Sequence, residues 1–380
     1  MKKLLTITVI LCSLATMSYG QYYLTDKAQI SVLTYSPVST IHTVFGHSSI
    51  RVYDPVNQIN TVYNYGMFDY DAPNFTLKFI KGKMLYCLGI QDYSQVVAYV
   101  QYRNQSLEEQ VLDLDSKQKQ DIYLFLQNNL KPENKDYYYD FFYDNCATRI
   151  RDILDSTTNI TYDTAAVFKA VTFRDLLQEY TPAKPWLEFG IDLILGLNVD
   201  KTAAFEHQMF LPDYLNQSLA VATISTDSTT KSIVKNTRTI HQATEVEASV
   251  SWLTPNVVFG LLFALTLLLN FVIQKERLRH IWNGIFLFIS GVAGVIFLTV
   301  WFGTEHVTTY NNLNVLWAFP VNIIAAIQVW RKQKMKKYFA VITIVNSLIL
   351  LTFPIFPQEL ATPVFFILLS LIMIGYKQFK

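Results

Sequence analysis

The segment DFFYDNCATRIRD, residues 140–152, contains the side chain best suited to covalent chemistry, Cys146. Asp144 and Asn145 are favoured N-cap residues, so the segment predicts a helix over 146–154 with Cys146 in its first turn. There the helix macrodipole and the free backbone N–H groups stabilise negative charge and lower the pKa of a thiol. The same N–H groups can form an oxyanion hole. The segment therefore predicts that Cys146 is a thiolate nucleophile.

A thiolate nucleophile needs a base, and histidine is the usual one. His47 is the candidate, because it follows Gly46 and opens a predicted strand in the segment FGHSSIRV. An imidazole on a strand that faces a cysteine on a helix is the geometry of papain-like thiol enzymes. Here the histidine precedes the cysteine in the chain, which is the permuted order. Asn64 is the first candidate for the group that orients the imidazole, and Asp69 is the second.

Two other interpretations of Cys146 stay open. Beyond the first 20 residues the chain has only Cys87 and Cys146, and in an oxidising compartment two such cysteines can form a structural disulfide. Alternatively, Cys146 is a buried and unreactive core residue. A serine nucleophile at Ser48 or Ser49 is disfavoured, because adjacent residues on a strand face opposite sides. The sequence has no HExxH motif, P-loop or GxGxxG motif, so no metal or cofactor is expected.

The elements that must position these residues lie in residues 21–250, which have the pattern of a mixed α/β domain. Short alternating segments predict strands, a DPVN turn at 54–57 predicts an antiparallel hairpin, and helical periodicity follows later. Residues 216–250 are rich in Ser and Thr and are expected to form peripheral strands that lead into the membrane. The expected strands cover 49–53, 61–65 and 78–89, and the expected helices cover 116–130, 146–154 and 173–180.

Residues 1–20 (MKKLLTITVILCSLATMSYG) have the pattern of a cleaved secretory signal. A basic start is followed by an apolar core at 4–14 and a small-residue exit at 18–20. The apolar core is too short to span a bilayer, which disfavours a first transmembrane helix. Cys12 lies inside this signal. The domain that follows is therefore expected outside the cytoplasm.

From residue 251 to residue 380 the composition is that of a transmembrane domain. Five apolar stretches lack Asp, Glu, Lys, Arg and His, and each is long enough to span with local adjustment. Because ionisable groups within spans usually mark ion or proton pathways, a transporter or pump is not expected. The five expected helices cover about 256–273, 281–302, 313–330, 338–354 and 361–376.

The distribution of basic residues predicts the orientation of these spans. Lys and Arg gather in the loops at 274–280 and 331–337 and in the tail at 377–380, whereas the loops at 303–312 and 355–360 have none. By the positive-inside rule the C-terminus is cytoplasmic and residues 21–250 are outside. The formal net charge of +1 gives no electrostatic basis for nucleic-acid binding.

Six segments in order resemble the N-terminal periplasmic domain of Lnb-type proteins: FGHSSIRVYD, NYGMFDY, GKMLYCLG, DNCATRIRD, WLEFGIDLILG and MFLPDYL. The resemblance covers about residues 25–220, and the domain-plus-helices architecture extends it to the end of the chain. The family is similar in logic to permuted NlpC/P60 and lecithin:retinol acyltransferase enzymes, which use a His-then-Cys pair. The resemblance implies an α+β fold: a permuted papain-like (NlpC/P60-like) periplasmic domain followed by a five-helix transmembrane bundle.

The same resemblance implies lipoprotein N-acyltransfer at the bacterial inner membrane, without a cofactor. An acyl chain of a membrane phospholipid would pass through a thioester on Cys146 to the α-amino group of a diacylglyceryl-cysteine lipoprotein. His47 would be the general base and acid, and Asn64 and Asp69 both fall in the motif NYGMFDY. The family's middle motif needs no cysteine, which disfavours a disulfide of Cys87.

Two other functions stay open from the sequence. A cell-wall cysteine peptidase or amidase of the NlpC/P60 kind would use the same groups, with water as the acceptor. Five spans favour the acyltransferase, because a hydrolase needs only one anchor. A non-enzymatic membrane scaffold or sensor would instead contain a Cys87–Cys146 disulfide, with His47 far from either sulfur.

Overall fold

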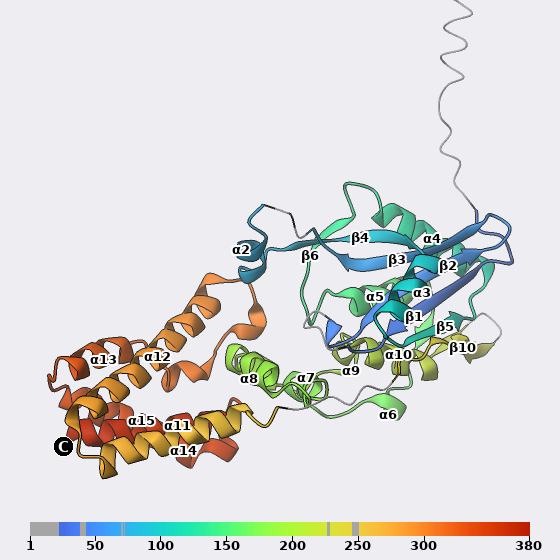
Figure 1. Cartoon of the computed structure of the whole chain (residues 1–380). Coiled ribbons are helices and arrows are strands. Elements are labelled where there is room, and N and C mark those ends of the chain that lie inside the picture. The colour runs from blue at the N-terminus through green and yellow to red at the C-terminus, as the bar shows by residue number, and fades with distance from the viewer. Residues whose placement is uncertain (1–22, 39–42, 70, 72, 226–228, 245–250) are drawn as a thin grey trace, which may run out of the picture.

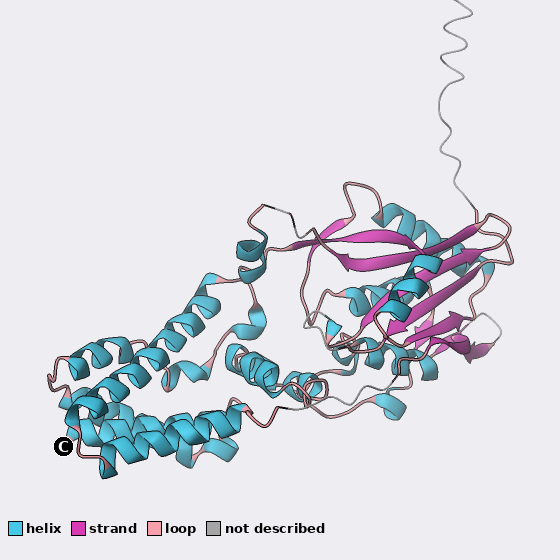
Figure 2. Ribbon diagram, in the orientation of Figure 1, coloured by secondary structure: helices cyan, strands magenta, loops and turns pink. Residues whose placement is uncertain are grey.

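The computed structural model describes residues 23–38, 43–69, 71, 73–225, 229–244 and 251–380. A β-sheet with packed helices makes up the N-terminal part, and helices alone make up the C-terminal part (Figures 1 and 2). The fold is therefore mixed α/β in its first part and helical in its second. The expected signal, residues 1–20 with Cys12, lies outside the described residues.

The main sheet has seven antiparallel strands in the order β10-β5-β1-β2-β3-β4-β6. The expected hairpin is confirmed, because β2 and β3 pair with Ile50 opposite Tyr63. The carboxylate of Asp54 fixes the turn by accepting hydrogen bonds from the amides of Val56 and Asn57. The strands are β1 (Gln29–Tyr35), β2 (His47–Asp54), β3 (Ile59–Met67), β4 (Leu85–Asp92), β5 (Leu107–Leu112), β6 (Asp136–Tyr138) and β10 (Val234–His241).

The strand expected over 78–89 is wrong in its first half. The chain instead forms a short helix, α2 (Phe75–Ile80), and β4 begins only at residue 85. Phe75 and Phe79 are one helical turn apart, and their ring centroids lie 6.4 Å apart in a stacked pair. The aromatic residues of this segment thus follow the helical period rather than the alternation of a strand.

The peripheral strands expected in 216–250 are present in part. A small three-stranded sheet contains β7 (Ile160–Thr161), β8 (Thr223–Ser225) and β9 (Thr230–Ser232), and β10 forms an edge of the main sheet. Residues 216–221 instead belong to the helix α10 (Pro212–Val221). Residues 226–228 and 245–250 lie outside the described residues.

Helices cover both faces of the main sheet. The helices α4 (Ser116–Asn129) and α5 (Cys146–Thr157) share one core with the sheet, in which Val52 and Ile150 are fully buried. On the other face α3 (Tyr93–Tyr102) buries Val96 against a cluster that contains Val62. The alternation along β2 and β3 therefore packs the helix that carries Cys146 against the centre of the sheet.

The three helices expected in residues 21–250 begin where the structure has them, at residues 116, 146 and 173. Asn145 caps α5 and Thr172 caps α7 (Phe173–Gln178), each through a capping box. The cap of α4 is Asp115 rather than the expected Ser116, which is the first helical residue. The other helices of this part are α6 (Thr164–Val167), α8 (Pro185–Ile194), the 3₁₀ turn η2 (Leu197–Asp200) and α9 (Phe205–Gln208).

The C-terminal part contains two helical segments long and apolar enough to cross a membrane, at 255–272 and 276–303. The stretch expected as one helix over 313–330 is broken: a 3₁₀ turn, η5 (Leu313–Leu316), precedes α13 (Asn322–Trp330). Pro320 lies in the break, and proline has no N–H to donate to a helix interior. The other elements are α11 (Pro255–Leu267), η3 (Leu268–Val272), α12 (Glu276–Gly303), η4 (Val307–Thr309), α14 (Lys336–Leu351), η6 (Phe353–Ile355) and α15 (Pro363–Phe379).

The helix α8 joins the two parts (Figure 1). Backbone carbonyls at its C-terminal end accept hydrogen bonds from the far part: Leu193 O from Asn312 Nδ2 at 2.7 Å, and Leu195 O from Gln358 Nε2 at 3.2 Å. At a second junction Lys83, just after α2, forms a 2.8 Å salt bridge with Glu305, just after α12. The loops at 303–312 and 355–360, expected on the outer side, thus both contact the N-terminal part.

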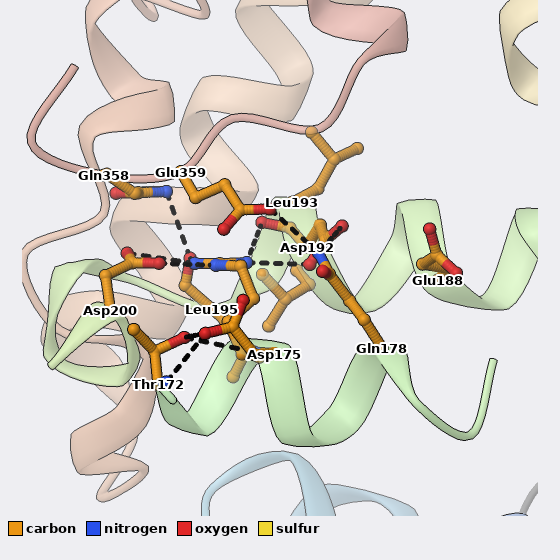
Figure 3. Close-up of polar contacts among 12 residues, drawn as sticks. Thr172, Asp175, Gln178, Glu188, Asp192, Leu193, Leu195, Asp200, Gln358 and Glu359 are labelled. Atoms are coloured by element: carbon orange, nitrogen blue, oxygen red, sulfur yellow. Dashed lines mark hydrogen bonds and ion pairs between the residues drawn. The ribbon is translucent and has the colours of Figure 1, made fainter. Parts of the chain in front are cut away.

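A fully buried guanidinium, that of Arg174 on α7, holds α8 and η2 in place. It donates to the carboxylates of Asp192 at 2.9 Å and Asp200 at 2.7 Å. The surrounding polar groups come from α7, α8, η2 and residues 358–359, and Figure 3 shows Asp192, Leu195 and Asp200 grouped around one point. Gln178 extends the network by donating to Glu359 at 3.1 Å. This cluster ties the sheet-bearing part to the helical part.

Candidate thiol site

Cys146 is the first residue of α5, and its position is fixed locally. The side-chain oxygen of Asn145 accepts hydrogen bonds from the amides of Ala147 at 2.8 Å and Thr148 at 3.0 Å. The amide nitrogen of Asn145 donates to the carbonyls of Phe141 and Phe210, both at 2.8 Å. Because Asn145 is itself clamped by these bonds, Cys146 begins the helix at a defined place and is only 7% exposed.

His47 is the first residue of β2, and the glycine before it sets the entry of the chain. Gly46 has φ +77°, a conformation that favours glycine, and a Cβ there would lie 2.8 Å from the carbonyl oxygen of Tyr35. His47 pairs with Tyr35 across the ladder, and their ring centroids lie 5.3 Å apart. The imidazole is therefore held at the end of the strand, where the start of α5 is also found.

The side chains of His47 and Cys146 are hydrogen-bonded to each other, and both pKa values shift. Burial alone would raise the pKa of the Cys146 thiol, but the charge of His47, the hydrogen bond to it and the amides of Ser48 and Ala147 lower that pKa. Burial alone would lower the pKa of His47, but the Cys146 thiolate and the hydrogen bonds to Cys146 and Asn64 raise it. Opposite shifts of this kind favour a thiolate–imidazolium pair.

Asn64 contacts the other side of the imidazole. His47 Nε2 lies 2.7 Å from Asn64 Oδ1, so Nε2–H donates to an atom that can only accept, and Nδ1 is left for the thiol. The amide of Asn64 is itself oriented, because its Nδ2 donates to Gln91 Oε1 at 2.9 Å. The ladder of β2 and β3 makes this contact possible, since Asn64 lies diagonally across from His47 on the same strand face.

Asp69, the second candidate for orienting the imidazole, lies elsewhere. Its side chain is exposed, and its carboxylate accepts a hydrogen bond from the backbone amide of Asp71 at 2.9 Å. The structure thus brings together Cys146, His47 and Asn64, and leaves Asp69 in the loop that follows β3.

The disulfide considered between Cys87 and Cys146 is contradicted, because both residues are free thiols. Cys87 lies on β4 between Tyr86 and Leu88, which pack against the core that contains Cys146. Cys87 itself is not a member of that core and is partly exposed, whereas Cys146 is buried in it. The interpretation of the protein as a non-enzymatic scaffold required this disulfide, so the structure does not support it.

Tyr137 on β6 interacts electrostatically with Cys146, which the sequence did not reveal. Its side chain is 8% exposed, and among the described residues its hydroxyl has no hydrogen-bond partner. Burial and the charge of Cys146 raise its pKa, so the hydroxyl stays protonated and can donate. The guanidinium carbon of Arg149 lies 3.5 Å from the centroid of the Tyr137 ring, and the same guanidinium forms a bidentate salt bridge with Asp144. The sequence of the aromatic segment 137–143 does not indicate which of its hydroxyls lacks a hydrogen-bond partner.

Comparison with protein families assigns both parts of the chain. Residues 15–181 match the family model of the Lnb N-terminal periplasmic domain, and residues 246–378 match that of the Lnb transmembrane domain. No curated protein and no solved structure gives a significant match. The two matched regions cover the thiol site, from β1 to α7, and the helical part.

Proposed function

Since this chain belongs to the Lnb family, membrane proteins associated with lipoprotein modification, we propose that it is a lipoprotein N-acyltransferase. It would move an acyl chain from a membrane phospholipid to the α-amino group of a diacylglyceryl-cysteine lipoprotein. The observation that carries this proposal is the chain of contacts from Cys146 through His47 to Asn64. A buried thiol paired with an oriented imidazole is the arrangement that forms acyl-thioesters.

The reaction proceeds in two halves. In the first, the Cys146 thiolate attacks the carbonyl carbon of the phospholipid ester, the ester C–O bond breaks, and the His47 imidazolium gives its proton to the departing lysophospholipid. In the second, the uncharged lipoprotein amine attacks the thioester, His47 takes the amine proton, and the thiolate leaves. The product is an amide, and Cys146 and His47 return to their starting state.

The proposed location is the bacterial inner membrane, with a periplasmic catalytic domain at 21–250, a five-helix transmembrane domain at 251–380 and a cytoplasmic C-terminus. The basic residues at 274–280 and 331–337, which lie at and just before the starts of α12 and α14, support this orientation. So do the contacts of the loops at 303–312 and 355–360 with the N-terminal part. The packing of α5 on β2 and β3 supports a permuted papain-like domain.

A reconstituted assay tests the proposal. The full chain is placed in phosphatidylethanolamine and phosphatidylglycerol vesicles whose acyl chains carry an isotopic label, with a synthetic diacylglyceryl-cysteine lipopeptide. Mass spectrometry is expected to find one labelled acyl group on the lipopeptide α-amine and an equal amount of lysophospholipid. Release of labelled fatty acid alone, or cleavage of added peptidoglycan without acylation, would assign the site to a hydrolase instead.

Replacement of Asn64 separates the two candidates for orienting His47. Asn64→Ala is expected to lower kcat about 100-fold with little change in KM, because the imidazole loses its fixed tautomer. The lost hydrogen bond also lowers the pKa of His47, so the alkaline limb of the pH–rate profile moves to lower pH. Asp69→Ala serves as the control and should leave rate and profile unchanged. If Asp69→Ala lowered kcat and Asn64→Ala did not, Asp69 would be the group that orients the imidazole.

We propose that the Tyr137 hydroxyl donates to the oxyanion of the tetrahedral intermediates, because it is buried, has no hydrogen-bond partner among the described residues and interacts electrostatically with Cys146. Tyr137→Phe is expected to lower kcat about 100-fold, the usual effect of losing one oxyanion donor. Stability should not fall, because the hydroxyl that is removed is buried and unpaired.

The matched control is Tyr63→Phe on β3, which removes a hydroxyl that accepts from Gln127 Nε2 at 2.6 Å. It should lower the unfolding temperature and leave kcat unchanged. If Tyr137→Phe lowered stability and left kcat unchanged, its hydroxyl would have a structural role only.

A further inference from the structure

An apolar cavity of about 320 Å³ lies where α8 meets α11 and α12. Phe189 and Leu193 of α8 form one wall, and Phe259 of α11 and Ile289 of α12 lie on two others. Its volume is in the range of small-ligand sites. The cavity belongs to neither part alone, because one wall comes from the sheet-bearing part and the others from the helical part.

The polar groups in the lining are already paired, so they recognise no polar ligand. The Ser290 hydroxyl donates to the Leu287 carbonyl at 2.9 Å and accepts from Asn322 Nδ2 at 3.1 Å. The indole N–H of Trp282 donates to Thr266 Oγ1 at 2.9 Å. The occupant that suits such walls is hydrocarbon, since an apolar cavity does not hold water well.

The cavity lies against the two segments that can cross a membrane, at 255–272 and 276–303. Ile289, in its lining, is 63% exposed and Ile285 is 42% exposed, so the cavity has a rim on the outer surface of the helices. In a membrane that surface meets lipid chains. Along α12 the lining runs from residue 282 to residue 293, about 16 Å of helix, close to half of the ~30 Å hydrocarbon core.

The helix α8 connects this cavity with the surroundings of the thiol site. Phe189 and Leu193 face the cavity, whereas Ile191 packs against an apolar cluster that contains Phe142. Phe142 belongs to the loop that leads directly into the cap of α5 and Cys146. One helix therefore forms a wall of the cavity on one side and supports the loop of the nucleophile on the other.

We propose that this cavity binds one fatty acyl chain of a membrane glycerophospholipid, with the glycerol end next to α8. The lipid's role as acyl donor rests on the proposed acyl transfer, whereas its binding does not. The occupant is assigned from apolar walls whose few polar groups are already paired, from the rim on the lipid-facing surface and from a length of about one leaflet.

Photo-crosslinking tests the occupant. The full chain is reconstituted in phosphatidylethanolamine and phosphatidylglycerol vesicles that contain a phosphatidylethanolamine with a diazirine in the middle of one acyl chain. After irradiation, peptide mass spectrometry is expected to find the label concentrated on cavity-lining residues of α8 and α12. A label spread evenly over the outward faces of the helices would overturn the proposal. A diazirine on the lipopeptide's own acyl chains that labelled the cavity in preference to the phospholipid would also overturn it.

Ala293→Phe provides a matched test, because it places a ring in the cavity. It is expected to lower labelling of the cavity about tenfold. Val295→Phe is the control, since Val295 lies on the same helix, is 43% exposed and is not in the lining. Equal labelling of the two variants would contradict the assignment. If either variant folds poorly, the crosslinking of the unchanged chain still tests the proposal.

Cys146→Ala separates this inference from the proposed reaction. Labelling of the cavity should persist in that variant, because the walls do not include the thiol. If the unchanged chain is labelled at the cavity but does not acylate the lipopeptide, the lipid site is supported and the proposed transferase is contradicted. Acylation by a chain whose cavity is not labelled would support the transferase and contradict the lipid site.

Discussion

Cys146→Ala is expected to abolish transfer of the labelled acyl group to the lipopeptide, with a loss of about 10⁴-fold or more. The thiolate forms the covalent intermediate, and no other group at the site can replace it. The unchanged chain, incubated with phospholipid alone, should carry an acyl group on Cys146 that hydroxylamine removes. Cys87→Ala is the matched control and should keep full activity, because Cys87 is a free, partly exposed thiol outside the core that contains Cys146. An active Cys146→Ala variant would refute the proposed reaction.

The pH dependence of the same reaction follows from the two shifted groups. The pKa of Cys146 is lowered and that of His47 is raised, so the thiolate–imidazolium pair is populated between these two values. The rate should rise as pH passes the lowered pKa of the thiol. It should fall again as pH passes the raised pKa of the imidazole, because the proton for the leaving group is then lost. A rate that only rises with pH, as for an unpaired thiol, would contradict the ion pair.

Arg174→Met is expected to lower the free energy of unfolding by about 3–5 kcal/mol, the largest stability effect we predict. The substitution keeps most of the side-chain volume but leaves the carboxylates of Asp192 and Asp200 buried without their cation. Asp192 then takes up a proton more easily, since burial already raises its pKa. Thermal unfolding of the full chain in detergent measures the effect. Hydrogen exchange should also show α8 and η2 opening first.

Two further variants distinguish the stability effect of the buried cluster from that of an exposed ion pair. Lys117→Met removes the cation of an exposed pair with Asp121 and should leave the stability nearly unchanged, because water screens that pair. Replacing Arg174, Asp192 and Asp200 together by apolar residues should recover much of the loss, because no unpaired charge then remains. A small effect of Arg174→Met alone would show that α8 is held mainly by its apolar contacts.

Much of the thiol site could be predicted because its elements form locally. Asn145 caps α5 through atoms within three residues, so Cys146 at the helix start follows from the segment itself. Gly46 and the alternation after it place His47 at the start of a strand. The motifs around these residues were also sufficient to indicate the Lnb family, which the family models confirm.

Other features depended on contacts that no local pattern contains. Asn64 and Asp69 lie in the same motif, and only the pairing of β2 with β3 brings one of them to His47. Only the packing shows that Cys87 and Cys146 are both free, with Cys146 in the core and Cys87 outside it, whereas the cysteine composition alone left a disulfide open. The apolar stretch at 313–330 predicted one helix, and Pro320 divides it.

The sequence by itself determined the starts of the capped helices at Cys146 and Phe173, the β2–β3 hairpin and which stretches are apolar enough for a membrane. These properties depend on caps, periodicity and composition over a few residues. The tertiary structure decided the contact of His47 with Cys146, the unpaired hydroxyl of Tyr137, the position of Arg174 and the cavity under α8. Each of these depends on how separate segments of the chain pack together, which follows from sheet order and packing and which local patterns do not specify.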